Sequence, residues 1–323
     1  MKPFWKNTRK GKSKKHSKTS GKKPKAQVCS RPMEEPWKPP IPMPKQADRL
    51  CEPKTGIIAP DIVEKQLNTY STLLVNEPKQ DTFYKEFKSK FRQLLSDKRR
   101  PFDVWRDFII MSACAMSNTV DRAHYDEREK RYLEAINKYE KSHQHLFPEL
   151  YADVVMALDE NPEQDFLGKM FMDLNLNSEE LKQIFTPYHV CQLMADVTMN
   201  NLVEQIEEQG YVSINDCCCG AGATLIAAIN AARHKLEDAG LNFQNHILVV
   251  GQDIEEVVAL MCYIQISLLG VAGYVKVGNA LTEPMTDNDS MENYWFTPMY
   301  FSDVWHTRRM IKKFMDLFEK EDK

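Results

Sequence analysis

The stretch YVSINDCCCGAGATLIAAI, residues 211–229, decides the fold of this chain. Its first six residues are typical of a short strand, and the residues from Ala223 onward have the apolar spacing of a helix. Gly220 and Gly222 lie between them and predict a turn where the backbone can approach a ligand, because glycine has no side chain to block it. The same alternation recurs downstream, with strands predicted at 246–254 and 274–281 around a helix at 255–270. This order predicts an α/β fold with a parallel sheet built from βαβ units.

Polar residues follow each of these three strands. Ligands of an open α/β sheet bind at the carboxyl ends of its strands, where the sequence places Asp216, Asp253 and Asn279. A carboxylate at Asp253 is suited to the hydroxyls of a ribose, and an amide at Asn279 to the edge of an adenine. The nicotinamide fingerprint requires a third glycine where this chain has Leu225, which disfavours a dehydrogenase. A turn whose glycines serve only backbone geometry is the alternative.

Three adjacent cysteines precede the glycines of the turn. Side chains point in alternate directions along extended backbone, so Cys217, Cys218 and Cys219 do not all face one ion. The Cys-x-x-Cys spacing of zinc and redox sites is absent from this stretch, and the sequence therefore predicts no metal site here.

The cysteine content and the N-terminal sequence indicate the cellular compartment of the protein. The chain has eight cysteines and no apolar segment behind its first charges, which predicts reduced thiols and a cytoplasmic protein. No stretch approaches the roughly 20 apolar residues of a membrane span.

The chain divides into three regions of different composition. Residues 1–55 are basic and then proline-rich, which predicts a disordered tail and linker. The net charge is only −3, yet residues 1–27 contain no acidic residue; they are either a solvated tail or an electrostatic arm for a phosphate backbone. Residues 56–180 predict a helical domain, and residues 181–323 the ligand-binding α/β domain.

Two helices illustrate the predicted helical domain. One face of a helix is predicted to carry Phe83, Phe87, Phe91 and Leu94 or Leu95, and Pro101 takes the first turn of the next. A charged helix further on is predicted to bury the narrow stripe of Tyr132, Leu133, Ile136 and Tyr139.

Two motifs resemble a known family. FTPYHVCQLMADV, residues 185–197, followed by NDCCCGAGATL, residues 215–225, is similar to the N6-adenine DNA methyltransferases, especially the modification subunits of type I restriction systems. The resemblance covers about Asp165 to Leu281. One departure is Cys217, since the family often has proline after the aspartate. The resemblance implies a Rossmann-like class I methyltransferase domain that binds S-adenosylmethionine and acts on double-stranded DNA.

The resemblance also implies roles for individual residues. Phe185, Thr186 and Pro187 are expected to contact the methionine end of the cofactor. Asp253 is expected to hold the ribose, and Asn279 to lie near the adenine. The turn itself is expected to line the cofactor through Asp216, Cys219, Gly220 and Gly222.

The family grips its target base with an (Asn/Asp/Ser)-Pro-Pro-aromatic motif, which this sequence lacks. The nearest equivalent is TPMY, residues 297–300, where Thr297 replaces the usual acceptor and Tyr300 is spaced to stack on a flipped base beside Pro298. An ordinary buried or edge strand over this stretch is the alternative.

The family continues past this point with further strands and a target-recognition domain. We therefore expect a sheet that is truncated at its C-terminus and is either completed by a specificity subunit or another protein, or left small. Two functions follow from the resemblance. The first is an S-adenosylmethionine-dependent DNA adenine-N6 methyltransferase or modification subunit, which transfers methyl directly to a flipped adenine. The second is a catalytically inactive methyltransferase-like subunit that binds DNA or regulates, and retains cofactor binding.

Overall fold

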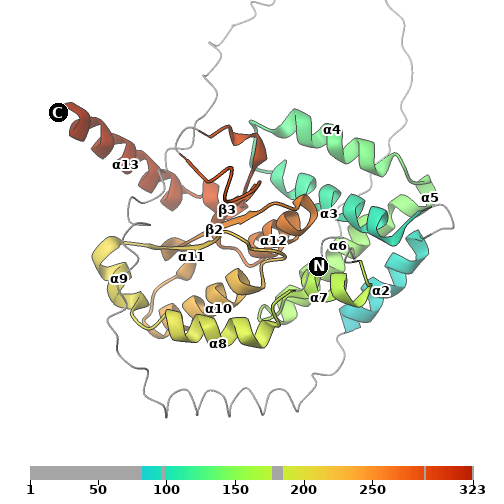
Figure 1. Cartoon of the computed structure of the whole chain (residues 1–323), viewed down its shortest axis with the longest axis horizontal. Helices are drawn as coiled ribbons and strands as arrows, with labels where there is room; N and C mark the ends of the chain where they lie inside the picture. Colours follow the sequence, from blue (N-terminus) through green and yellow to red (C-terminus); the bar gives the residue numbers. More distant parts are fainter. Residues whose placement is uncertain (1–81, 96–98, 177–184, 287–288, 322–323) are drawn as a thin grey trace, which may run out of the picture. The chain divides into compact units, whose positions relative to one another are not determined.

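A computed structural model of the chain describes residues 82–95, 99–176, 185–286 and 289–321 (Figure 1). The predicted tail at 1–55 and the first part of the predicted helical domain, up to residue 81, lie outside the described residues. So does the boundary predicted between residues 180 and 181.

The N-terminal part of the described chain is helical. It comprises α2 (Thr82–Leu94), α3 (Pro101–Ser117), α4 (Tyr125–Ile136), α5 (Lys141–Gln144), α6 (Leu146–Glu160) and α7 (Phe166–Asp173). The apolar face predicted for α2 is confirmed at Phe87, Phe91 and Leu94, which are buried, whereas Phe83 is only partly buried and Tyr84 is buried instead. Pro101 opens α3, where its missing N–H leaves no helical hydrogen bond unmade.

The stripe predicted for the charged helix α4 is confirmed in part. Tyr139 is buried, and Tyr132 and Ile136 pack against the core, but Leu133 is 46% exposed and α4 ends at Ile136. The helix also buries Arg128 and Ala135. The guanidinium of Arg128 donates to Asp121 Oδ2 at 2.8 Å and to the Tyr294 carbonyl at 2.6 Å. It also lies over the ring of Trp295, 4.1 Å from the centroid. The hydrogen bond to Tyr294 and the stacking on Trp295 therefore attach the helical part to β4 of the sheet.

The C-terminal part alternates helices and strands. Its elements are α8 (Tyr188–Thr198), α9 (Leu202–Gln209), β1 (Val212–Asp216), α10 (Ala223–Asp238), α11 (Phe243–His246), β2 (Ile247–Asp253), α12 (Glu256–Leu268), β3 (Ala272–Val277), η2 (Met291–Asn293), β4 (Tyr294–Phe296), η3 (Pro298–Phe301) and α13 (Asp303–Glu321). Pro187 is the N-cap of α8, which begins at Tyr188.

The sheet has four strands in the order β1-β2-β3-β4. The first three are parallel, as predicted, with Asp216 opposite Gly251 and Asp253 opposite Val277. The prediction of a wholly parallel sheet is wrong, because β4 runs antiparallel to β3. A parallel partner requires a crossover connection, usually through a helix, whereas the described residues between β3 and β4 form only turns and a short 3₁₀ helix. The fold is therefore mixed α/β with a mixed sheet.

Helices cover one face of the sheet. Strand β2 and strand β3 pack against α12, α10 packs against β1 and β2, and α8 runs beside α10 (Figure 1). Helix α3 packs in turn on α12, so the helical part and the sheet share one hydrophobic core. A second cluster on the other face contains Val250, Tyr274, Phe296, Tyr300 and Trp305. None of the helices that the structure describes is both long and apolar enough to cross a membrane.

Candidate cofactor site

The three parallel strands end at one edge of the sheet, which we call the carboxyl edge: Asp216, Asp253 and Val277. Asn279 follows β3 two residues later. The structure therefore brings the three predicted polar residues to the same edge, as the strand order requires.

The turn between β1 and α10 depends on its two glycines. Gly220 and Gly222 have φ values of +51° and +98°, in the left-handed region that other residues rarely adopt. A Cβ at Gly222 would lie 2.9 Å from Cys262 Sγ on α12, so both the conformation and the space require glycine there. The backbone N–H of Cys219 donates to the Gln252 carbonyl at 3.0 Å and fastens the turn beside β2.

Both carboxylates hold this turn in shape. Asp216 Oδ1 accepts from the Cys218 N–H at 3.0 Å, and Oδ2 accepts from the Thr224 hydroxyl. Asp253 Oδ2 accepts from the Gly220 N–H at 2.8 Å, although Asp253 lies on the neighbouring strand. Each carboxylate oxygen has two lone pairs, so both groups can accept further hydrogen bonds from a ligand. Asp216 and Asp253 are each partly exposed.

The segment before α8 approaches the same turn. The ring of Phe185 would lie 3.4 Å from a Cβ at Gly220, and it packs on Phe171 of α7 at a centroid distance of 5.6 Å. Thr186 and Pro187 are exposed. Asn279 Oδ1 accepts from the N–H groups of Leu281 at 2.9 Å and Thr282 at 3.3 Å, which shapes its own loop.

The three cysteines differ in burial. Cys217 and Cys218 are exposed, whereas Cys219 is buried. Its contact with the Cys262 thiol, together with burial, raises the pKa of Cys219 well above its usual value. A protonated thiol is a poor nucleophile and a poor metal ligand. Nowhere in the described ranges do three His, Cys, Asp or Glu side chains gather closely enough to hold a metal ion.

The predicted base-binding residues lie elsewhere. Thr297 is fully buried; its hydroxyl donates to the Val271 carbonyl at 2.8 Å and accepts from the Gly273 N–H at 3.0 Å. Because β4 is antiparallel, it ends beside the start of β3, which we call the amino edge. At about 3.3 Å per residue, the length of β3 puts this edge roughly 16 Å from the carboxyl edge.

Tyr300 is likewise enclosed at the amino edge. Its ring packs on Phe296 at 4.8 Å, and Arg309 lies over it at 4.1 Å. The structure therefore does not bring Thr297, Pro298 and Tyr300 to the glycine turn, and the described geometry corresponds to the alternative of an ordinary buried segment.

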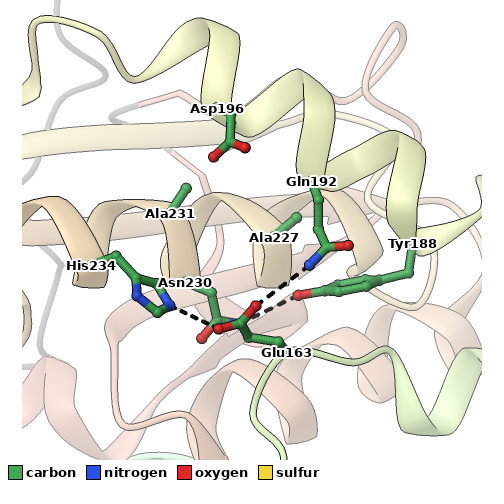
Figure 2. Close-up of a pocket in the computed structure, with 8 residues that line it drawn as sticks. All are labelled: Glu163, Tyr188, Gln192, Asp196, Ala227, Asn230, Ala231 and His234. Carbon is green, nitrogen blue, oxygen red and sulfur yellow. Dashed lines mark hydrogen bonds and ion pairs between the residues drawn. The ribbon is translucent and has the colours of Figure 1, made fainter. Parts of the chain in front are cut away.

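A small polar cleft lies between α8 and α10 (Figure 2). Figure 2 shows Glu163 reaching toward His234, with Glu163 Oε1 2.8 Å from His234 Nε2, and toward Gln192 at 3.5 Å. These side chains pair with one another across the cleft. Sequence reasoning missed this cluster, because its members come from three separate segments.

The comparisons with known proteins agree with the fold. Residues 164–321 match a family model described as N-6 DNA Methylase. The chain matches no curated protein and no solved structure.

Proposed function

We propose that this chain, which belongs to the N6-adenine DNA methyltransferase family through residues 164–321, binds S-adenosylmethionine at the glycine turn and methylates adenine N6 in double-stranded DNA. One observation carries the proposal. Asp216 and Asp253 both accept backbone hydrogen bonds from the turn at the carboxyl edge, and Gly220 is the residue that Asp253 holds. A glycine turn with two carboxylates is suited to a cationic cofactor that carries a ribose.

The residues at this edge fit that cofactor chemically. Asp253 would accept from the ribose hydroxyls, and Asp216 would lie under the turn and favour a positive charge. Phe185, packed against Gly220, would form the wall near the methionine end with Thr186 and Pro187. Asn279 would lie near the adenine. When bound, the cofactor supplies an electrophilic methyl group on a sulfonium.

A second candidate function is supported by the position of Thr297. The amino group of adenine is a weak nucleophile, because its lone pair is delocalised, and it needs oxygen acceptors beside it. The Thr297 hydroxyl already bonds two backbone groups at the amino edge. This favours a methyltransferase-like subunit that binds cofactor and DNA, or regulates, without catalysing transfer.

Two measurements separate these functions. Calorimetry with S-adenosylmethionine tests binding, and transfer of labelled methyl to unmethylated DNA tests catalysis. We expect Asp216→Ala to weaken binding at least about tenfold through the loss of charge-assisted hydrogen bonds. Asp238→Ala is the matched control, because it removes the same charge from the exposed end of α10. Absence of cofactor binding by the wild-type chain would contradict both functions; binding without transfer supports the second.

The basic segment at 1–27 is proposed as a DNA-binding arm. Its deletion should weaken DNA binding and flatten the dependence of affinity on salt, because fewer counterions are released. An unchanged affinity for DNA would mean that this segment is a solvated tail and not a DNA-binding arm. We also propose that a specificity subunit or another protein completes the sheet. We further propose that the protein is cytoplasmic.

A further inference from the structure

Gln265 joins the glycine turn to the helical part of the chain. It lies on α12, where its neighbours are apolar, and its side chain is fully buried. Its Nε2 donates to the Ala221 carbonyl at 2.9 Å and to Asp165 Oδ1 at 2.8 Å. Its Oε1 accepts from the Leu167 N–H at 3.0 Å. One side chain therefore bonds two segments that are far apart in the sequence.

The helical end of this junction is rigid. Asp165 caps α7, and its Oδ1 also accepts from the Gly168 N–H at 2.8 Å. A Cβ at Gly168 would fall 2.0 Å from Asp165 Oδ2, so the carboxylate fills the space that this glycine leaves. Burial raises the pKa of Asp165. The start of α7 is thus a fixed point from which Gln265 reaches the turn.

The glycine turn, at the other end of this junction, depends on the hydrogen bond from Gln265. Ala221 lies between two glycines of positive φ, and glycine backbone is the most mobile in a chain. Ala221 is 2% exposed, so water does not replace a lost partner of its carbonyl. The N–H of the neighbouring Gly220 donates a hydrogen bond to Asp253 Oδ2. We therefore expect a displacement at Ala221 to disturb the hydrogen bond between Gly220 and Asp253, the carboxylate proposed to bind the cofactor.

We propose that Gln265 is a positioning residue for the cofactor turn, which it holds in register with the start of α7 through the Ala221 carbonyl. The expected loss of cofactor affinity rests on the proposed function. The expected loosening of the turn does not, because it can be measured in the chain without cofactor.

The test compares two variants of the full chain. Gln265→Met keeps the length of the side chain and removes all its hydrogen bonds. Asp165→Ala is the matched control, because it removes the α7 cap and one partner of Gln265 but leaves the bonds of Gln265 to the Ala221 carbonyl and to the Leu167 N–H of α7. We expect both variants to lower the melting temperature. Only Gln265→Met should weaken S-adenosylmethionine binding, by about tenfold, while Asp165→Ala stays within about twofold of wild type.

Hydrogen exchange in the unliganded chain supplies the second readout. In a peptide that covers residues 217–226, exchange should be faster in Gln265→Met than in Asp165→Ala, because only the former frees the turn. Gln265→Leu, which also removes every hydrogen bond of this side chain, should show the same faster exchange and serves if the methionine variant does not fold. Equal exchange in the Gln265 variants and in Asp165→Ala would overturn the inference. So would cofactor affinity that falls equally in the two. If the wild-type chain binds no cofactor, the proposed function fails and the exchange experiment alone decides the role of Gln265.

Discussion

Replacing Thr297 with valine separates a structural role from a base-binding role. Valine has nearly the same shape as threonine but no hydroxyl. In the folded protein this leaves the Val271 carbonyl and the Gly273 N–H buried without the partner that Thr297 provides. An unsatisfied buried polar group costs about 1–3 kcal/mol. Both groups lie beside β2 or β4 and relax partly, so we expect Thr297→Val to lower the free energy of unfolding by about 2–4 kcal/mol.

Urea denaturation followed by tryptophan fluorescence measures this change. Thr297→Ser is the control, because it keeps the hydroxyl and loses one methyl group, at about 1 kcal/mol. We expect cofactor affinity to be unchanged in both variants, since the carboxyl edge lies at the other end of β3. A Thr297→Val variant as stable as wild type that loses methyl transfer would refute this reasoning and return Thr297 to the base site.

Three further predictions follow from other contacts. Gly222→Ala should lower both stability and cofactor affinity in a thermal melt and a calorimetric titration, because φ is +98° and Cys262 Sγ lies 2.9 Å from the added Cβ; an unchanged melt would contradict the need for glycine. Arg128→Met should lower the free energy of unfolding by about 1–3 kcal/mol in urea denaturation, because it leaves the buried carbonyl of Tyr294 without its donor while Asp121 keeps its contact with His124, and an unchanged free energy of unfolding would contradict this. Burial alone would raise the pKa of Asp289, but the hydrogen bond from Lys276 and others outweigh it and hold the pKa at about 2. Its contribution to stability is therefore present above pH 4 and lost as pH falls toward 2, so a stability–pH curve of Asp289→Asn should be flatter in that window than that of wild type.

The sequence was sufficient where the signal is local. The strand that ends at Asp216, the turn and the helix from Ala223 were predicted because strand spacing, glycines and helix spacing follow one another within a short segment. Asp253 could be placed at the same edge because parallel strands connected by helices end together.

The sequence was insufficient where a structural feature depends on residues far away in the chain. Nothing within residues 294–296 specifies whether that strand runs parallel or antiparallel to β3, and this direction alone moves Thr297 to the amino edge. The burial of Arg128 was missed for the same reason. Its partners include the carbonyl of Tyr294, far along the chain, whereas a helical pattern reports only residues on one helix.

The two edges of the sheet therefore have different chemistry, and this bears on catalysis. A base that meets a cofactor at the glycine turn is within reach only of groups at the carboxyl edge. Of the polar residues that the sequence placed there, Asp216 and Asp253 are assigned to the cofactor in the proposed function, and Asn279 Oδ1 already accepts two backbone hydrogen bonds within its own loop. Methyl transfer then requires the Asn279 loop to open, or an acceptor from outside the described residues or from another protein. Cofactor binding without transfer by the isolated chain, with transfer restored by a partner subunit, is the result that would identify the last of these.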